Sequence, residues 1–278
     1  MENKFYKAEN KGVTMLKSGL FEAEPLLRHC FSTRLGGVSE GALSSLNLGF
    51  NRGDERENVL TNYRRLCDAA GLYYPRLTRT AQEHGINVTK ITEQNVGTGF
   101  ILPPFCNTDA LITNLPDTPV LCQTADCVPI LLYDRRKHAV AAIHAGWRGM
   151  IDGVIEETVC AMGIEYQSDP DDMIAAIGAC IGPCCFEVDE DVAEKFVSEF
   201  GALSVIRGNG KPHVDLFRCA RDALTGCGIS ERRIDCSCEC TKCNPSFYYS
   251  HRYSGYERGS LASIIAVAGD KSPQIYLK

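Results

Sequence analysis

The sequence has no run of about eighteen consecutive apolar residues, and so no candidate for a hydrophobic transmembrane helix. Residues 1–10 lack the apolar core of a secretory signal peptide. Basic residues are scattered, and the formal net charge is -6 with a pI near 5.6. A nucleic-acid groove needs a basic face. We therefore expect a cytoplasmic protein that engages neither membranes nor nucleic acids.

Histidine is also scarce. The chain has six histidines, and no two of them are separated by a single residue. The common zinc deaminase signature, in which His-x-Glu is followed by Pro-Cys-x-x-Cys, is absent as well. These two absences exclude deaminases of that type and metal clusters built from His-x-His pairs.

Cysteine, in contrast, is abundant, with fifteen in 278 residues. In a short secreted chain this count would indicate a disulfide framework. In a long chain without a visible signal peptide, we expect reduced thiols in a reducing compartment, some of them acting as small core residues.

The order of the expected elements favours an α+β fold in one domain over residues 1–278. Helical spacing of apolar residues predicts helices over 58–70 and 150–162, each ended by a glycine. Asp189 and Asp215 are placed to cap two further helices. Strands and helices alternate irregularly, without a linker or a repeat, which favours layered, mixed β-sheets over a doubly wound parallel sheet.

The stretch with the most chemical content lies at residues 124–149. Two apolar, strand-like runs place Cys127 beside the first run and His144 at the end of the second, followed by a Gly-Trp-Arg-Gly turn. Among the other histidines, His84 precedes Gly85 in a turn. Reactive side chains are commonly held in this way, on loops positioned by buried strands.

Three interpretations of these side chains remain open from spacing alone. In the first, His84, Cys127 and His144 bind zinc and leave a fourth coordination position for water. In the second, Cys127 is a nucleophile without a metal, and a histidine is its base. In the third, Cys127 is a core residue and His144 a capping side chain.

Six short segments, spread in order from about residue 28 to 268, resemble the signatures of one protein family. That family is known both as multicopper polyphenol oxidoreductase (laccase-domain) proteins and as laccase-domain purine nucleoside phosphorylases. The segments are Phe31-Ser-Thr-Arg-Leu-Gly-Gly37, Gln82-Glu-His-Gly85, Thr124-Ala-Asp-Cys127, His144-Ala-Gly-Trp-Arg-Gly149, Ile181-Gly-Pro-Cys-Cys-Phe-Glu187 and Phe247-Tyr-Tyr-Ser-His-Arg252.

The resemblance implies an α/β/β/α layered fold, shared with cysteine-histidine toxin deamidase domains. It also implies a catalytic metal site at His84, Cys127 and His144, with zinc as the expected metal and copper as the alternative. Two departures concern other residues. The family more often has arginine where His251 stands, and the final Gly-Arg is replaced here by Glu257-Arg258-Gly259.

The implied activities are phosphorolysis of adenosine, inosine and methylthioadenosine, and deamination of adenosine. The chain would then be a transferase with a hydrolase activity, and its partners would be a purine nucleoside and phosphate; its oligomeric state is left open. The alternatives are a copper-dependent polyphenol oxidase, a metal-free Cys-His hydrolase or deamidase, and a metal-dependent binding module. A conventional laccase is excluded, because its copper cluster needs His-x-His pairs.

Phosphorolysis requires an anion site beside the ribose. Arginines and glycine-exposed backbone N–H groups provide such sites. The candidates are Arg34, next to Gly36 and Gly37, and Arg148, at the start of a helix, with Asn47 in a turn-rich segment as a further substrate-binding residue. The alternative for the arginines is a structural one, in which they bond turn carbonyls.

A cysteine-rich segment, Cys236-Ser-Cys-Glu-Cys-Thr-Lys-Cys243, is the last feature of note. Its four cysteines could bind a structural zinc ion, although their spacing is tighter than in most zinc fingers. Reduced thiols and a labile disulfide are the alternatives.

Overall fold

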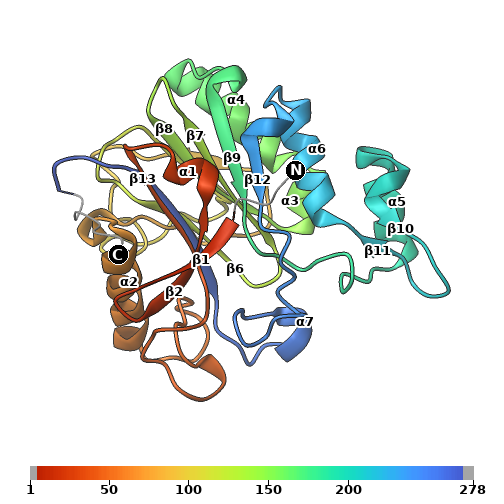
Figure 1. Ribbon diagram of the computed structural model, residues 1–278, viewed down its shortest axis with the longest axis horizontal. Coiled ribbons are helices and arrows are strands. Elements are labelled where there is room, and N and C mark those ends of the chain that lie inside the picture. The colour runs from red at the N-terminus through yellow and green to blue at the C-terminus, as the bar shows by residue number, and fades with distance from the viewer. Residues whose placement is uncertain (1–4, 272–278) are drawn as a thin grey trace.

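Two β-sheets lie face to face in the computed structural model, which describes residues 5–271 (Figure 1). In the first sheet, all neighbouring strands of the described chain are antiparallel. The C-terminal strand lies inside this sheet, between elements from earlier in the chain. The order is β1 (Phe5–Asn10), β2 (Val13–Ser18), β3 (Leu27–Ser32), β13 (Leu261–Val267) and β6 (Val120–Thr124).

The second sheet is mixed. Its two edge strands pair in parallel with their neighbours, and the inner strands pair antiparallel. The order is β12 (Ile234–Cys236), β9 (Met173–Ile177), β7 (Val128–Asp134), β8 (Ala139–Ala145), β5 (Ala110–Thr113) and β4 (Val88–Lys90). The predicted fold, α+β with mixed sheets, is confirmed.

Strict alternation of side chains divides the core into three layers. In β13, Leu261 and Ile265 face the second sheet, whereas Ala262 and Ile264 face α2 (Arg56–Ala70) on the outer side of the first sheet. On the outer side of the second sheet, α4 (Val154–Tyr166) packs against β8, and α6 (Leu216–Gly226) packs against β7 and β9. The layers therefore run α/β/β/α, as the resemblance implied.

The helix ends follow the sequence signals only in part. Gly71 ends α2 in the left-handed conformation, as predicted. The single helix predicted over 150–162 is wrong at its start and at its end. Its first residues belong to α3 (Trp147–Ile151), which is separated from α4 at Gly153, where φ is 94. At the other end, α4 continues past Gly163 to Tyr166. Asp215 caps α6 through its side chain, whereas Asp189, in the cap position before α5 (Glu190–Phe200), instead bonds Lys211.

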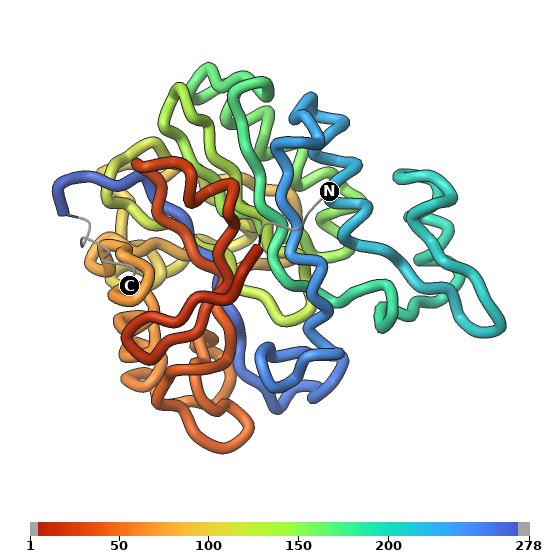
Figure 2. The backbone as a smooth tube through the Cα atoms, viewed as in Figure 1, coloured from red at the N-terminus to blue at the C-terminus, as the bar shows by residue number. Residues whose placement is uncertain are grey.

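The remaining elements are short. The segment that carries α5 and the hairpin of β10 and β11 projects to one side of the layered body (Figure 2). No helix in residues 5–271 is long and apolar enough to span a membrane. The short helices and strands are α1 (Gly19–Glu22), α7 (His251–Ser254), β10 (Val205–Ile206) and β11 (His213–Val214), with 3-10 turns at Gly41–Leu43, Tyr74–Arg76, Pro170–Asp172, Ala202–Ser204 and Glu231–Arg233.

Gly178, directly after β9, tests how tightly the two sheets pack. A Cβ atom there would lie 2.3 Å from Cδ1 of Phe31 and 2.9 Å from Cγ of Pro129. We expect Gly178→Ala to lower the free energy of unfolding by about 1–3 kcal/mol, because overpacking forces the neighbours to shift. Urea denaturation measures this. The control is Gly226→Ala, whose Cβ would meet no atom within 4 Å; equal midpoints for the two variants would contradict the expectation.

Candidate functional site

Adjacent strands bring Cys127 and His144 together. Cys127 lies between β6 and β7, and His144 lies in β8, where it is opposite Pro129 in the register of the two strands. His84 comes from the loop before β4 and has a left-handed backbone with φ 65. The ends of neighbouring strands and this loop thus carry the three side chains that the sequence predicts to form the site.

The three side chains form one cluster. Their ligand atoms lie within 4.8 Å of one another. Cys127 Sγ is 3.7 Å from Nε2 of His84, and the rings of His84 and His144 meet edge to face with centroids 4.8 Å apart. His84 is exposed, Cys127 half-buried and His144 buried, so the cluster opens to solvent on the His84 side.

A buried carboxylate, Asp109, holds the cluster in place. Its Oδ1 lies 2.7 Å from Nδ1 of His144, and it accepts backbone N–H bonds from Glu83, His84 and Gly85 at 3.2, 2.9 and 2.8 Å. The bond at Nδ1 leaves Nε2 of His144 for Cys127 or a metal. Sequence analysis missed Asp109; the available signal was an acidic residue directly before the buried strand β5.

Charge interactions couple these groups. Burial opposes the thiolate, but the attraction of His144 and hydrogen bonds from His144 and His84 lower the pKa of Cys127 to about 6. For His144, burial opposes the charged form, but Cys127 and Asp109 raise the pKa to about 9. The metal-free site therefore holds a thiolate–imidazolium pair at neutral pH.

Two glycines of the segment that follows His144 are required by close approach. A Cβ at Gly146 would lie 2.4 Å from Cδ2 of His84, and one at Gly149 would lie 2.5 Å from the carbonyl oxygen of Gly85. Both contacts are shorter than any side chain allows. The start of α3 can therefore pack against the His84 loop only because these positions lack side chains.

Asp126 fixes the backbone next to Cys127. It has a left-handed conformation with φ 92, unusual for a residue other than glycine. Its carboxylate accepts hydrogen bonds at 2.6 Å from Oγ1 of Thr241 and from the backbone N–H of Arg252. Segments close to the C-terminus thus set the position of the cysteine.

The donor set fits a zinc-type ion. Two imidazole nitrogens and one thiolate make a three-ligand protein site of catalytic type, in which a fourth position is left for water or substrate. Asp109 bonds the far nitrogen of His144, as carboxylates do for zinc-binding histidines.

Within residues 5–271, none of the three predicted substrate-binding residues makes a hydrogen bond or ion pair with His84, Cys127 or His144. Arg34 donates to the carbonyls of Ser44 and Pro245, both at 2.9 Å. Asn47 is fully buried and its amide bridges the turns around it, with bonds to Asp54, Gly49 and Ser260.

Arg148 is exposed, with its guanidinium 4.2 Å from the ring of Trp147. Nδ1 of His251 bonds the carbonyl oxygen of Gly255, the residue at the end of the short helix that His251 begins.

Arg258 is closer to the chemistry than the sequence indicated. It is 7% exposed, and within residues 5–271 its Nε has no hydrogen-bond partner. Burial and the nearby charge of Arg52 lower the pKa of Arg258 to about 10, although Asp126 and Cys127 act in the opposite direction. Arg258 therefore has both a second guanidinium and the Cys127 thiolate in its surroundings, and two neighbouring guanidinium groups attract an anion.

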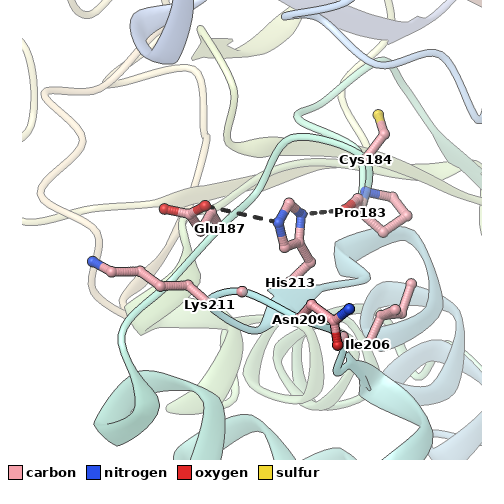
Figure 3. Close-up of a pocket in the computed structure, with 9 residues that line it drawn as sticks. Pro183, Cys184, Glu187, Ile206, Asn209, Lys211 and His213 are labelled. Atoms are coloured by element: carbon pink, nitrogen blue, oxygen red, sulfur yellow. Dashed lines mark hydrogen bonds and ion pairs between the residues drawn. The ribbon is translucent and has the colours of Figure 1, made fainter.

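A pocket of about 440 Å³ lies elsewhere, between the turn at 182–187 and the β10–β11 hairpin. His213 crosses its wall, with Nδ1 2.7 Å from the Pro183 carbonyl oxygen and Nε2 4.0 Å from Glu187 (Figure 3). None of its nine lining residues belongs to the His84–Cys127–His144 cluster. The candidate active site is therefore identified by the reactive side chains of His84, Cys127 and His144 and not by this pocket.

The thiolate–imidazolium pair predicts a pH profile for alkylation of the metal-free protein. Iodoacetamide reacts with the thiolate, which is present above the pKa, so the rate at Cys127 should reach half its plateau near pH 6. Asp109→Asn removes a group that raises the pKa of His144. His144 then carries less charge, the pKa of Cys127 rises and the midpoint moves to higher pH.

Peptide mass spectrometry after timed alkylation measures this midpoint. Asp152→Asn, which removes an exposed carboxylate elsewhere, is the control. A wild-type midpoint at the ordinary cysteine value of about 8.5 would contradict the pair.

Comparisons with known proteins identify relatives of this chain. The family model for multi-copper polyphenol oxidoreductase laccase matches residues 28–268. A purine nucleoside phosphorylase from Bacteroides thetaiotaomicron is 32% identical over 247 residues, covering 87% of this chain and 92% of that protein. Purine nucleoside phosphorylase YfiH from Escherichia coli is 35% identical over 240 residues, covering 85% of this chain and 92% of that protein.

Solved structures give the same answer. YlmD from Geobacillus stearothermophilus superimposes with a TM-score of 0.87 at 29% identity, covering 96% of this chain and 100% of that one. A YfiH protein from Bacillus licheniformis also has a TM-score of 0.87, at 28% identity and the same coverage. The resemblance noted in the sequence is therefore confirmed, and the chain belongs to the multi-copper polyphenol oxidoreductase laccase family.

Proposed function

We propose that the protein is a metal-dependent purine nucleoside phosphorylase. In this reaction an oxygen of inorganic phosphate bonds to C1′ of the ribose while the bond from C1′ to the purine nitrogen breaks. The products are ribose 1-phosphate and the free base, which takes up a proton. Relatives named purine nucleoside phosphorylase at 30–36% identity support the assignment. The observation that carries it is the cluster of His84, Cys127 and His144, with Arg258 close to Cys127.

Zinc is the metal we propose, held by Nε2 of His84, Sγ of Cys127 and Nε2 of His144. Bound there, zinc would supply a Lewis acid and lower the pKa of a coordinated water. Asp109 would keep the His144 ring in the orientation for binding, and its three backbone hydrogen bonds would keep His84 within reach. Copper is the alternative ion.

We propose that Arg258 and Arg52 bind phosphate, because an anion would relieve the repulsion between their two positive charges. Arg34 uses only part of its guanidinium for turn carbonyls, so its other N–H groups can donate to phosphate or ribose. Arg148 would contribute charge from the start of α3, and Asn47 would act by holding the turn at 258–260. The cysteine-rich composition suits a reducing compartment, and we propose that the protein works in the cytoplasm.

Removing the thiol ligand tests the proposal. We expect Cys127→Ala to lose tightly bound zinc and to reduce phosphate-dependent release of hypoxanthine from inosine by on the order of 100-fold or more. Cys160→Ala, which changes an exposed cysteine on α4, should keep both properties. A Cys127→Ala protein with full metal content and full turnover would overturn the assignment.

Arg258 tests the phosphate site separately. Loss of a charge-assisted hydrogen bond costs about 1.5–3 kcal/mol, so Arg258→Gln should raise the KM for phosphate about 10- to 100-fold. The KM for inosine should change much less. Arg64→Gln on the exposed face of α2 is the matched control. An unchanged KM for phosphate would place the anion site elsewhere.

Two further activities are kept as candidates on specific observations. The lowered pKa of Cys127 favours a metal-free cysteine hydrolase or deamidase, and the family's description names a polyphenol oxidoreductase. Adenosine deamination is a third activity to measure on the same preparation. Hypoxanthine release that needs phosphate indicates the phosphorylase, ammonia release from adenosine the deaminase, and oxygen uptake with a phenol the oxidase. Cleavage of an amide by metal-free protein, checked by metal analysis, would indicate the cysteine hydrolase.

A further inference from the structure

A second group of metal-binding side chains lies outside the proposed active site. Cys184 and Cys185 follow β9, whereas Cys240 and Cys243 follow β12, and their four Sγ atoms lie within 4.8 Å of one another. The sulfur of Cys243 is 3.5 Å from that of Cys184 and 3.4 Å from that of Cys185. Folding thus joins two cysteine pairs from distant parts of the chain.

These distances match thiolates around a common ion. With Zn–S bonds of about 2.3 Å, tetrahedral geometry separates the sulfurs by about 3.8 Å. A disulfide would need about 2.05 Å, and all four cysteines are free. Cys184 and Cys243 are exposed, so they do not serve as core residues. Soft thiolate ligands in this number select a zinc-type ion.

The backbone at Gly182 provides both a hydrogen-bond donor and space for the sulfur atoms. The N–H of Gly182 donates to Sγ of Cys240 at 3.2 Å, a bond that a thiolate ligand accepts. A Cβ at Gly182 would lie 3.1 Å from Cβ of Cys240 and 3.4 Å from Sγ of Cys184. Glycine at this position keeps the space around the two sulfurs open.

The cysteine-rich segment 236–243 is therefore not a single site. Cys236 and Cys238 form a separate pair, with their sulfurs 3.2 Å apart, and Cys236 belongs to β12. Only Cys240 and Cys243 join the four-sulfur cluster. Figure 3 shows the Cys184 sulfur pointing away from His213, so the cluster is distinct from the pocket that Cys184 also lines.

We propose that Cys184, Cys185, Cys240 and Cys243 bind one structural zinc ion. Binding would displace the thiol protons to solvent and form four Zn–S bonds without any oxidation. The ion would clamp the turn at 182–187 onto the loop that follows β12. The same loop carries Thr241, which bonds Asp126 next to Cys127, so the structural ion would steady the active-site cysteine from outside. The proposal does not depend on which reaction the protein catalyses.

Metal analysis of the full-length protein tests this site. After zinc loading under reducing conditions and removal of free metal, wild-type protein should retain two zinc ions per chain. Cys240→Ser/Cys243→Ser should retain one, and Cys127→Ala should retain the other. Cys238→Ser, in the same segment but outside the cluster, is the matched control and should retain both. Wild-type protein with a single ion that Cys127→Ala abolishes would overturn the proposal.

Cobalt substitution identifies the ligands. Cobalt at a four-thiolate site gives intense thiolate-to-metal charge-transfer absorption, which should persist in Cys127→Ala and vanish in the double variant. If the double variant does not fold, Cys184→Ser, at an exposed position, is measured instead and should show weakened absorption and one fewer retained zinc ion. Wild-type levels of both in Cys184→Ser, or a disulfide among the four cysteines that persists after reduction and zinc loading, would contradict the assignment.

Discussion

The carboxylate of Asp109 is the constraint on which the geometry of the candidate active site depends. It sits at the start of β5, buried, and bonds both the imidazole of His144 and three successive N–H groups of the loop that carries His84. Such a carboxylate is stable in the interior because every lone pair has a donor. Asp109 therefore fixes the position of the His84 loop relative to His144 in β8, which strand pairing alone would not do. Cys127, between β6 and β7, is the third member of the cluster.

Much of this arrangement is predictable from sequence, for physical reasons. Cys127 and His144 flank apolar runs whose period and length predict neighbouring strands, and glycine-rich turns mark where side chains reach the edge of a sheet. The layered fold and the candidate metal ligands are predicted by signature segments that resemble the family. The helix at Gly163 was misjudged, because packing against β8 outweighs the local tendency of glycine to end a helix.

Other features could not be read from sequence because they arise only on folding. Asp109 bonds residues more than twenty positions earlier in the chain, and Cys184 meets Cys243 across an even longer separation. The burial of the Arg258 guanidinium likewise arises only when the chain has folded around it. Local spacing carries no information about such contacts. Spacing also left the role of the cysteine-rich segment open, because it does not reveal that Cys236 and Cys238 pair with each other while Cys240 and Cys243 meet Cys184 and Cys185. The two clusters proposed to bind metal are linked by a long-range contact, because Asp126, next to Cys127, bonds Thr241 in the loop that carries Cys240 and Cys243.

The position of β13 has a consequence for how the molecule is made. This strand, near the C-terminal end, pairs with β3 on one side and β6 on the other, in the middle of the first sheet. During synthesis the ribosome releases β3 and β6 long before β13, so each waits with an unpaired edge. The first sheet, and the apolar layer between the two sheets, can close only once residues 261–267 have emerged. Until then the nascent chain exposes two unpaired strand edges, and protecting such edges from wrong pairing is a task suited to a ribosome-associated chaperone.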